Sequence, residues 1–600
     1  MHYRIDNKFR KPTFIIFLLL IALFILSRSV YLERDLPSTV ISSYVAIDEL
    51  YYTIPAFNLY HYGETIHNIV PFLSEDLQPI NIMENTFTFF TLSLFGNNYY
   101  GLRMASVLAA LIIFVLLYLI LKKIVNGNMQ EEGFYEVNNL EKRNYVLYFV
   151  MAYLLCDFSF LMAGRVAEPT IFRILALVVV IYIGTLPSLF TKLESKGYSM
   201  LLGFLALAAV VFVYVYNAFI FCALAVSVFL WAYKSGLKNA VKQSTFFLLG
   251  TILCLLTYQL FIDVTYNSSL AEVIQHLIPY QNRMGVGVSH TARIESYLLN
   301  TIFLFLTNVF RFNIILLLIF LVSLPVFFKK LKTEYNNFDI LIFNLMVFLI
   351  MQSIVINDYP LRKLIILLPI AAILMTTSYV HFIRHLAEFV SSNKGRRFVN
   401  LAWFSAFVIC LAVTALYFSP KMSGDSVSIL GKFMYLNLGV FLTINLVLLL
   451  KHLSLLRIPK AVTIVCLVLM LIPNLYLDSK YVFFNRTFHF RDAMISMSEK
   501  VDGKIIVGGC SYGFRLYNKS IPIWDFYRYN CSSSERQLQY NVVFDRMFAE
   551  GIGSYSIAYT DEMPDAPIGQ TFMSQHGLQL EEEFELGENL DCNLGLYSPK

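Results

Sequence analysis

The sequence predicts a polytopic all-α membrane protein of about 13 transmembrane helices, followed by a small α/β domain outside the membrane. The chain of 600 residues is 57% hydrophobic and only 14% charged, whereas a soluble domain carries about 25% charged residues. Apolar segments recur as far as residue 477, and polar residues dominate after it. We therefore expect a membrane domain over 1–477 and an extracytoplasmic domain over 478–600. The net charge of +5 is small and gives no reason to expect a nucleic-acid partner.

Each predicted span is an apolar window of about 20 residues, the length at which a helix crosses a bilayer. The first window lacks a small-residue cleavage site, so we expect it to stay in the protein as a span. The candidate spans are 12–29, 103–121, 145–162, 170–187, 200–216, 218–233, 244–262, 307–328, 338–356, 362–381, 400–418, 432–450 and 461–477.

The positions of lysine and arginine orient these spans. Basic residues precede the first span and recur in every second loop, near 4–11, 122–143, 192–196, 234–242, 329–332, 384–397 and 451–460. Cytoplasmic loops carry such an excess of positive charge. We therefore expect a cytoplasmic N-terminus and, because the number of spans is odd, a C-terminal domain on the outer side.

The first outer loop, about 30–102, is long and acidic and contains the stretch Ala46–Glu64. Asp48 and Glu49 stand side by side in that stretch, soon after the first span. Carboxylates are too polar to lie unpaired in hydrocarbon, so we expect both at or above the membrane surface. A solvated loop with a helix start at Asp48 is the alternative. Further along, Asn85–Phe95 is amphipathic enough to form a helix that lies along the interface.

Three more outer segments carry charged residues on the same face of the membrane. The turn between the third and fourth spans contains Arg165 and Glu168, and the segment before the tenth contains Arg362 and Lys363. The loop 263–306 could close over a bound substrate, and it adds Arg283, His290 and Arg293.

This combination of groups suits the transfer of a sugar from a lipid-linked phosphosugar. A carboxylate can take the proton from an attacking hydroxyl group. Arginine binds phosphate oxygens through two parallel hydrogen bonds and stays charged next to lipid. Stabilising the charge that develops on the departing phosphate in a dry site is usually the larger contribution to the rate.

Four stretches resemble motifs of the GT-C membrane glycosyltransferases, above all of the aminoarabinose-transferase (ArnT-like) and protein O-mannosyltransferase families. The Asp48-Glu49 pair follows the first span, Gly101-Leu102-Arg103 opens the second, and Gly164–Pro169 forms the turn after the third. Arg362–Pro369 opens a late span. The resemblance implies the GT-C fold and a polyprenyl-phosphate sugar donor.

The resemblance also implies roles for individual residues. Asp48 would be the general base, or would orient the acceptor, with Glu49 as its support. Glu168 would be a second acid in the same cavity. Arg165 and Arg362 would approach the donor phosphate. No cofactor is required, although the three acids could share a divalent cation, as in the oligosaccharyltransferase branch of the superfamily.

One departure from the family pattern affects the phosphate contact. Leu77-Gln78-Pro79 stands where the ArnT-like pattern has Lys-Pro-Pro. A glutamine cannot supply the positive charge, so Lys363 becomes a candidate substitute. There are structural alternatives for these cations. Arg362 and Lys363 could be interface anchors, and Arg165 could pair with Glu168 at helical spacing.

The sequence therefore predicts an integral-membrane glycosyltransferase that moves a sugar from a polyprenyl-phosphate donor to a lipid, glycan or protein hydroxyl on the outer face. A transporter or lipid flippase is the alternative. However, the predicted spans are nearly free of charge and show no repeat, unlike paired transporter halves. A non-catalytic assembly subunit is a third reading. The ArnT-like plan favours a bacterial plasma membrane.

The residues after 477 read as a small α/β domain. Strand-like runs occur at Lys504–Gly508 and Ser554–Tyr559, and glycines and prolines separate them. We expect this domain to cap the membrane domain and not to carry the chemistry.

Overall fold

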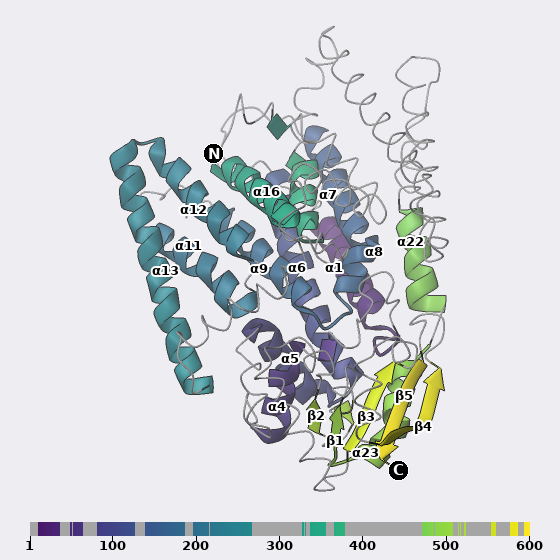
Figure 1. Ribbon diagram of the computed structural model, residues 1–600. Helices are drawn as coiled ribbons and strands as arrows, with labels where there is room; N and C mark the ends of the chain where they lie inside the picture. The colour runs from purple at the N-terminus through teal and green to yellow at the C-terminus, as the bar shows by residue number, and fades with distance from the viewer. Residues whose placement is uncertain are drawn as a thin grey trace, which may run out of the picture.

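The structure is a computed structural model, drawn in Figure 1 with its described residues as coloured ribbons. The residues described are 10–35, 49–50, 52–63, 81–125, 138–185, 196–214, 217–266, 327–328, 331, 337–355, 365–377, 471–484, 487–507, 514, 516–517, 521–523, 554–559, 577–585 and 593–599.

Long helices pack into a bundle, which makes up most of the described chain (Figure 1). They are α1 (Arg10–Ser29), α6 (Tyr99–Val125), α7 (Asn138–Cys156), α9 (Pro169–Gly184), α11 (Lys196–Ala208), α12 (Ala218–Tyr233), α13 (Leu237–Tyr266) and α16 (Asn337–Val355). Shorter helical segments are α8 (Phe158–Ala163), the π-helix η1 (Ala209–Val213) and the 3₁₀-helix η3 (Ile365–Leu367).

Among the described residues, three helices are long and apolar enough to cross a bilayer: Tyr99–Val125, Lys196–Val213 and Leu237–Val264. Shorter apolar helices overlap other predicted spans, at Ile15–Ser29, Leu147–Cys156, Pro169–Gly184, Ala218–Tyr233, Asn337–Gln352 and Ile365–Thr377. The predicted spans near 400–418 and 432–450 lie outside the described residues. The number of about 13 spans therefore stays a prediction.

Helices α11 and α13 approach each other through two glycines. A Cβ atom added at Gly203 would lie 1.9 Å from the carbonyl oxygen of Phe247, and one added at Gly250 would lie 1.9 Å from that of Met200. Only glycine lets the backbones come this close. Such packing through small residues is typical of helices in membranes, where side-chain hydrophobicity alone does not drive association.

Two short helices, α4 (Ile54–Tyr62) and α5 (Ile82–Phe95), lie together at one end of the bundle (Figure 1). Asn85 holds them to each other. Its Oδ1 accepts a hydrogen bond from the Ala56 amide at 3.0 Å, and its Nδ2 donates to the Tyr52 carbonyl oxygen at 3.1 Å. The helix predicted in the second half of this loop is confirmed as α5.

The C-terminal part contains α22 (Ile472–Asp478), the π-helix η5 (Ser479–Phe484), α23 (His489–Val501) and a five-stranded sheet of order β2-β1-β3-β5-β4. The strands are β1 (Ile505–Val507), β2 (Ile521–Ile523), β3 (Ser554–Tyr559), β4 (Leu578–Glu585) and β5 (Asn593–Pro599). β1 runs parallel to β2 and β3, and β5 runs antiparallel to β3 and β4. Both predicted strand-like runs are present, as β1 and β3.

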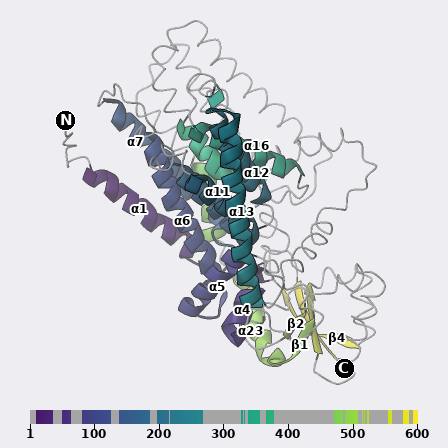
Figure 2. The same ribbon diagram turned by 90° about the vertical axis from the view of Figure 1, so that its left-hand side faces the viewer.

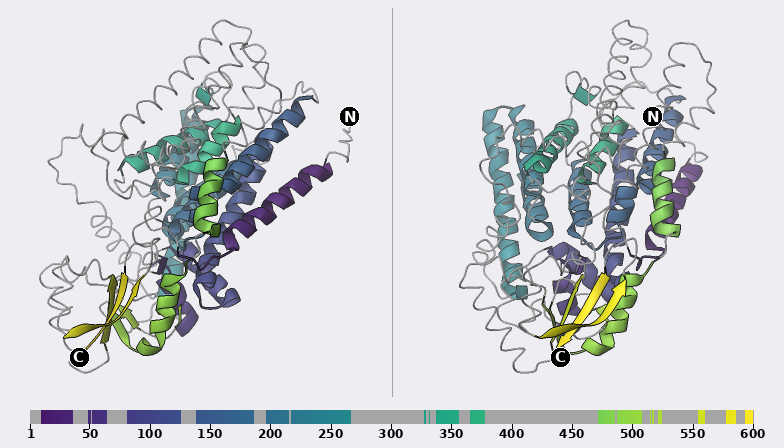
Figure 3. Two further views of the ribbon diagram at one scale, coloured as in Figure 1. Left: turned by 90° about the vertical axis from the view of Figure 1, so that its right-hand side faces the viewer. Right: turned by 45° about the vertical axis from the view of Figure 1, so that its right-hand side comes forward.

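The sheet and α23 lie at the same end of the bundle as α4 and α5 (Figures 2 and 3). Asp35, after α1, accepts hydrogen bonds from the amides of His489 at 2.7 Å and Phe490 at 3.2 Å, at the start of α23. A carboxylate in this place satisfies amides that the helix itself leaves unpaired. One apolar core runs through the contact, with Leu50 and Leu102 in the same cluster as Phe490 and the sheet.

Gly250→Ala should lower the unfolding temperature of the purified protein in detergent. The added methyl group would push α13 away from α11, and overpacking of this kind costs about 1–3 kcal/mol. Gly197→Ala is the matched control, because a Cβ atom there meets nothing within 4 Å and alanine is the better helix former. An equal loss of stability in both variants would contradict the close contact of α11 and α13.

Candidate functional site

The site is built around a buried ion pair between Glu49 and Arg103. Glu49 has none of its surface exposed and Arg103 only 3%. The guanidinium donates two parallel hydrogen bonds to the carboxylate, from Nε to Oε1 and from Nη2 to Oε2, both at 2.8 Å. Oε1 also accepts from the Ala167 amide at 2.9 Å. Bidentate pairs of this kind are among the strongest and most directional contacts in proteins.

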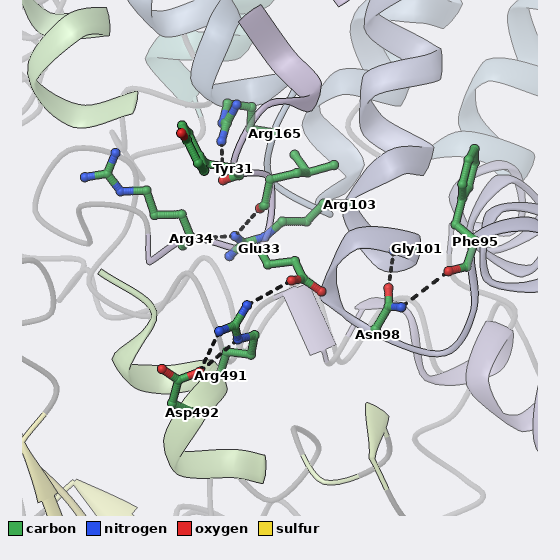
Figure 4. Close-up of polar contacts among 11 residues, drawn as sticks. Tyr31, Glu33, Arg34, Phe95, Asn98, Gly101, Arg103, Arg165, Arg491 and Asp492 are labelled. Carbon is green, nitrogen blue, oxygen red and sulfur yellow. Dashed lines mark hydrogen bonds and ion pairs between the residues drawn. The ribbon is translucent and has the colours of Figure 1, made fainter. Parts of the chain in front are cut away.

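Arg103 also binds the chain that follows α1. Its Nη1 donates to the carbonyl oxygen of Leu32 at 2.9 Å and to that of Arg34 (Figure 4). The ion pair therefore joins four segments of the chain: the residues after α1, the helical residue Glu49, the start of α6 and the turn before α9. We call the Glu49–Arg103 pair with these contacts the clamp.

The Gly101-Leu102-Arg103 motif places the arginine for this contact. The Asn98 side chain accepts a hydrogen bond from the Gly101 amide at 2.7 Å and so caps the start of α6 (Figure 4). A Cβ atom at Gly101 would lie 2.2 Å from the carbonyl oxygen of Gly96, so only glycine fits. Leu102 is fully buried in the core shared with the C-terminal domain.

Arg165 holds the end of α1. Its Nη1 donates to the carbonyl oxygens of Ser27, Arg28 and Val30 at 2.9–3.1 Å, and its Nη2 donates to that of Tyr31 at 2.7 Å (Figure 4). The carbonyls of Ser27 and Arg28 belong to the last turn of α1, where a helix leaves its carbonyls unpaired. Burial, followed by the neighbouring cation of Arg103, lowers the pKa of Arg165 to about 9, which leaves it charged at neutral pH.

These contacts bear on the alternative in which Arg165 pairs with Glu168. Within the described residues, the guanidinium of Arg165 bonds to backbone carbonyls and not to Glu168. Arg165 is fully buried, so the structure gives it a positioning contact. Its predicted contact with a donor phosphate stays a prediction.

Glu168 occupies the N-cap position of α9 and is 3% exposed. Its backbone is extended, with φ −133° and ψ 156°, and Pro169 follows at the first helical position, where its fixed φ suits the helix. A carboxylate at this end of a helix is stabilised by the helix dipole. The neighbouring Ala167 amide binds Glu49, so the clamp brings the two predicted acids to one place.

Glu84 belongs to this group, although the sequence did not single it out. It lies in the first turn of α5 and is 1% exposed. Burial, followed by the negative charges of Glu168 and Glu49, raises the pKa of Glu84 well above its usual range. Neither of its carboxyl oxygens has a hydrogen-bond partner among the described residues. The only feature of the sequence that could have pointed to Glu84 is that it is an acidic residue within an apolar, helix-forming stretch.

The other predicted site residues lie outside the described residues: Asp48, Arg283, His290, Arg293, Arg362 and Lys363. Their roles stay predictions. Asp48 is the immediate neighbour of Glu49, so the clamp fixes the chain next to it. In the part of the chain that the structure describes, no group of three His, Cys, Asp or Glu side chains could hold a metal ion.

The fold was compared with solved structures. A crystal structure of ArnT from Cupriavidus metallidurans bound to undecaprenyl phosphate matches with a TM-score of 0.54 and 10% identity, over 97% of this chain and 97% of that one. The chain has the ArnT fold. The apo structure of the same protein matches with a TM-score of 0.49, 10% identity and the same coverage. No protein-family profile and no curated protein matches the sequence.

The ArnT fold covers both the helical bundle and the C-terminal domain, since the match spans nearly the whole of each chain. The described helices and the small sheet thus agree with the fold class that the sequence resemblance implied. At 10% identity the match shows the fold alone, because the activity of a fold depends on its site residues.

Glu84→Gln should change how stability depends on pH. Because the pKa of Glu84 is raised by folding, the folded protein keeps a proton that the unfolded chain has already lost. The contribution of Glu84 to stability therefore falls as pH rises from the unfolded pKa towards the folded one. The glutamine side chain of the variant cannot ionise, so the variant does not lose this stability as the pH rises.

Parent and Glu84→Gln should unfold at similar temperatures at about pH 4, where both side chains are neutral, and the variant should be the more stable at about pH 8. Thermal unfolding across this range measures the difference. Curves that run parallel at all pH values would contradict a raised pKa at Glu84.

Proposed function

We propose that this chain is an integral-membrane glycosyltransferase that moves a sugar from a polyprenyl-phosphate donor to an acceptor hydroxyl. The observation that carries the proposal is the group of acids, Glu49, Glu84 and Glu168, held at one end of a bundle with the ArnT fold. The compared ArnT structure contains undecaprenyl phosphate, which is the kind of lipid carrier that the sequence resemblance implied for this chain.

Asp48 is the proposed general base. It would take the proton from the acceptor hydroxyl as that oxygen attacks the anomeric carbon of the donor sugar. A bond then forms between the acceptor oxygen and the anomeric carbon. The bond between that carbon and the phosphate oxygen breaks, and its electron pair leaves with the polyprenyl phosphate. Attack from the side opposite the leaving group inverts the anomeric centre.

The clamp supports this role by geometry. Glu49 is fixed by hydrogen bonds from Arg103 and from the Ala167 amide, and these hold the backbone next to Asp48. Holding a base within reach of the reacting hydroxyl accounts for much of the rate that positioning can supply. Glu168 is the proposed second acid on the same side.

Arg362 and Lys363 are the proposed contacts for the donor phosphate. Arg165 is less suited to that task, since its two terminal nitrogens already bind the carbonyls at the end of α1. Fixed cations beside the phosphate would stabilise the charge that develops as it departs. The lysine would take over where Gln78 replaces the family's cationic residue.

The proposed setting is a bacterial plasma membrane, with the N-terminus in the cytoplasm and the acids on the outer face. The positive-inside pattern of the loops supports this orientation. The acceptor would be a lipid, a glycan or a protein hydroxyl, and the sugar a hexose or a pentose. The ionisable groups described above gather at one end of the bundle, which suits chemistry at a membrane surface better than transport across it.

Asp48→Asn should abolish sugar transfer by the protein reconstituted in lipid, assayed with radiolabelled polyprenyl-phosphate sugars and a membrane acceptor fraction. Loss of a general base typically costs about 10²–10⁴-fold in rate, while the amide keeps the shape of the side chain. Glu75→Gln, an acid elsewhere in the same loop, is the matched control and should transfer at the parental rate. Full activity of Asp48→Asn would contradict the proposed mechanism.

A further inference from the structure

One face of α5 carries buried polar atoms that bind nothing in the described protein. Asn81, Glu84 and Thr88 are 3%, 1% and 0% exposed. No hydrogen-bond partner exists among the described residues for Nδ2 and Oδ1 of Asn81, for Oε1 and Oε2 of Glu84, or for Oγ1 of Thr88. Residues spaced by three, four and seven lie on one side of a helix. We call these three side chains the α5 polar face.

Such a face is unusual, because nearly all buried polar groups are hydrogen-bonded. Leaving one unsatisfied costs roughly 1–3 kcal/mol. The rest of α5 follows the rule: Thr86 donates to the carbonyl oxygen of Ile82 at 2.8 Å, and Thr91 to that of Phe87 at 3.1 Å. Thr88 makes no such bond, although the same helix offers one. The polar atoms of this face are therefore left open for something else.

Asn81 shows the same departure. It holds the N-cap position of α5 with φ 56° and ψ 47°, the left-handed region, and its side chain makes no capping hydrogen bond. Asparagine at an N-cap usually binds the amides of the first turn. Here the side chain is buried and binds none of these amides. Unfavourable backbone conformations that persist in a structure are concentrated at binding and active sites.

The α5 polar face borders the candidate site. Glu84 lies close enough to Glu168 and Glu49 for their charges to act on it. Phe87 on α5 meets Phe172 on α9 edge to face, with ring centroids 5.5 Å apart, which fixes the two helices to each other. An anion such as a phosphate would be repelled by the neighbouring carboxylates, whereas a neutral group with many hydroxyls would not.

We propose that the α5 polar face binds the hydroxyl groups of a saccharide ring through the side chains of Asn81, Glu84 and Thr88. The inference rests on the proposed function and assigns the sugar-binding part of that site. An amide, a neutral carboxyl and a hydroxyl each donate and accept, which matches ring hydroxyls that do the same. The saccharide belongs either to the donor or to the acceptor, and separate measurements distinguish the two.

The first test compares Thr88→Val with Thr91→Val, which removes a hydroxyl that α5 already satisfies. If the donor sugar sits here, the parent binds polyprenyl-phosphate glucose or mannose more tightly than bare polyprenyl phosphate. Thr88→Val reduces that preference by roughly 3- to 10-fold, the value of one hydrogen bond. If the acceptor sits here, Thr88→Val raises the acceptor KM by a similar factor. Thr91→Val changes neither quantity.

The second test uses Glu84. Glu84→Gln keeps a neutral group that donates and accepts hydrogen bonds, so its sugar preference or acceptor KM should stay within about threefold of the parental value. Glu84→Met is similar in size but apolar, and it should weaken the same quantity by roughly 10-fold or more. Unfolding temperatures show whether each variant folds. Thr88→Val should be as stable as the parent, since it removes an unsatisfied group.

The outcomes separate this inference from the proposed function. A sugar preference that Thr88→Val and Glu84→Met both weaken supports the inference even if the protein transfers no sugar. If the folded variants match the parent in sugar preference and, with transfer measured, in acceptor KM, the inference is overturned while the proposed function stands. Equal losses of sugar preference, or equal rises in acceptor KM, in Glu84→Gln and Glu84→Met would contradict the claim that Glu84 binds the saccharide as a neutral carboxyl.

Discussion

The contact between Glu49 and Arg103 is the constraint on which the described site depends. Two parallel charge-assisted hydrogen bonds in a buried setting fix both side chains, and the Ala167 amide donates a second hydrogen bond to Oε1. Breaking a buried pair by removing one partner costs about 3–5 kcal/mol, because the other charge is left uncompensated. The pair therefore fixes Glu49, the residue that follows the proposed base in the sequence.

The clamp also reaches the C-terminal domain. Arg103 binds the carbonyl oxygen of Arg34, and the next residue, Asp35, binds the first amides of α23. Arg491 of α23 then pairs with Glu33 at 3.0 Å (Figure 4). The short chain after α1 is thus held from both sides. The C-terminal domain therefore stabilises the segment of chain that Arg103 binds, and this gives the domain a structural part in the site.

Much of the bundle could be read from the sequence, because a span needs a long apolar window and the bilayer fixes its length. The meeting of Glu49 and Glu168 also followed from loops that share one face. The partner of Glu49 could not be predicted from the sequence, because Arg103 lies 54 residues away and no local pattern couples the two residues. The alternative in which Arg165 pairs with Glu168 at helical spacing is not seen among the hydrogen bonds of Arg165 described above, because α9 begins after Glu168 and Arg165 lies in the turn before it. Burial of Glu84 was missed because amphipathicity does not say which polar side chains turn inward.

A double-mutant cycle on Glu49→Gln and Arg103→Met tests the central claim most directly, with sugar transfer and unfolding free energy measured for each protein. If the two side chains act as one clamp, each single variant loses transfer and about 3–5 kcal/mol of stability, and the double variant is no worse than the singles. The exposed pair Lys500–Glu582 serves as the control cycle and should show little coupling. Losses that simply add for Glu49 and Arg103 would contradict the account.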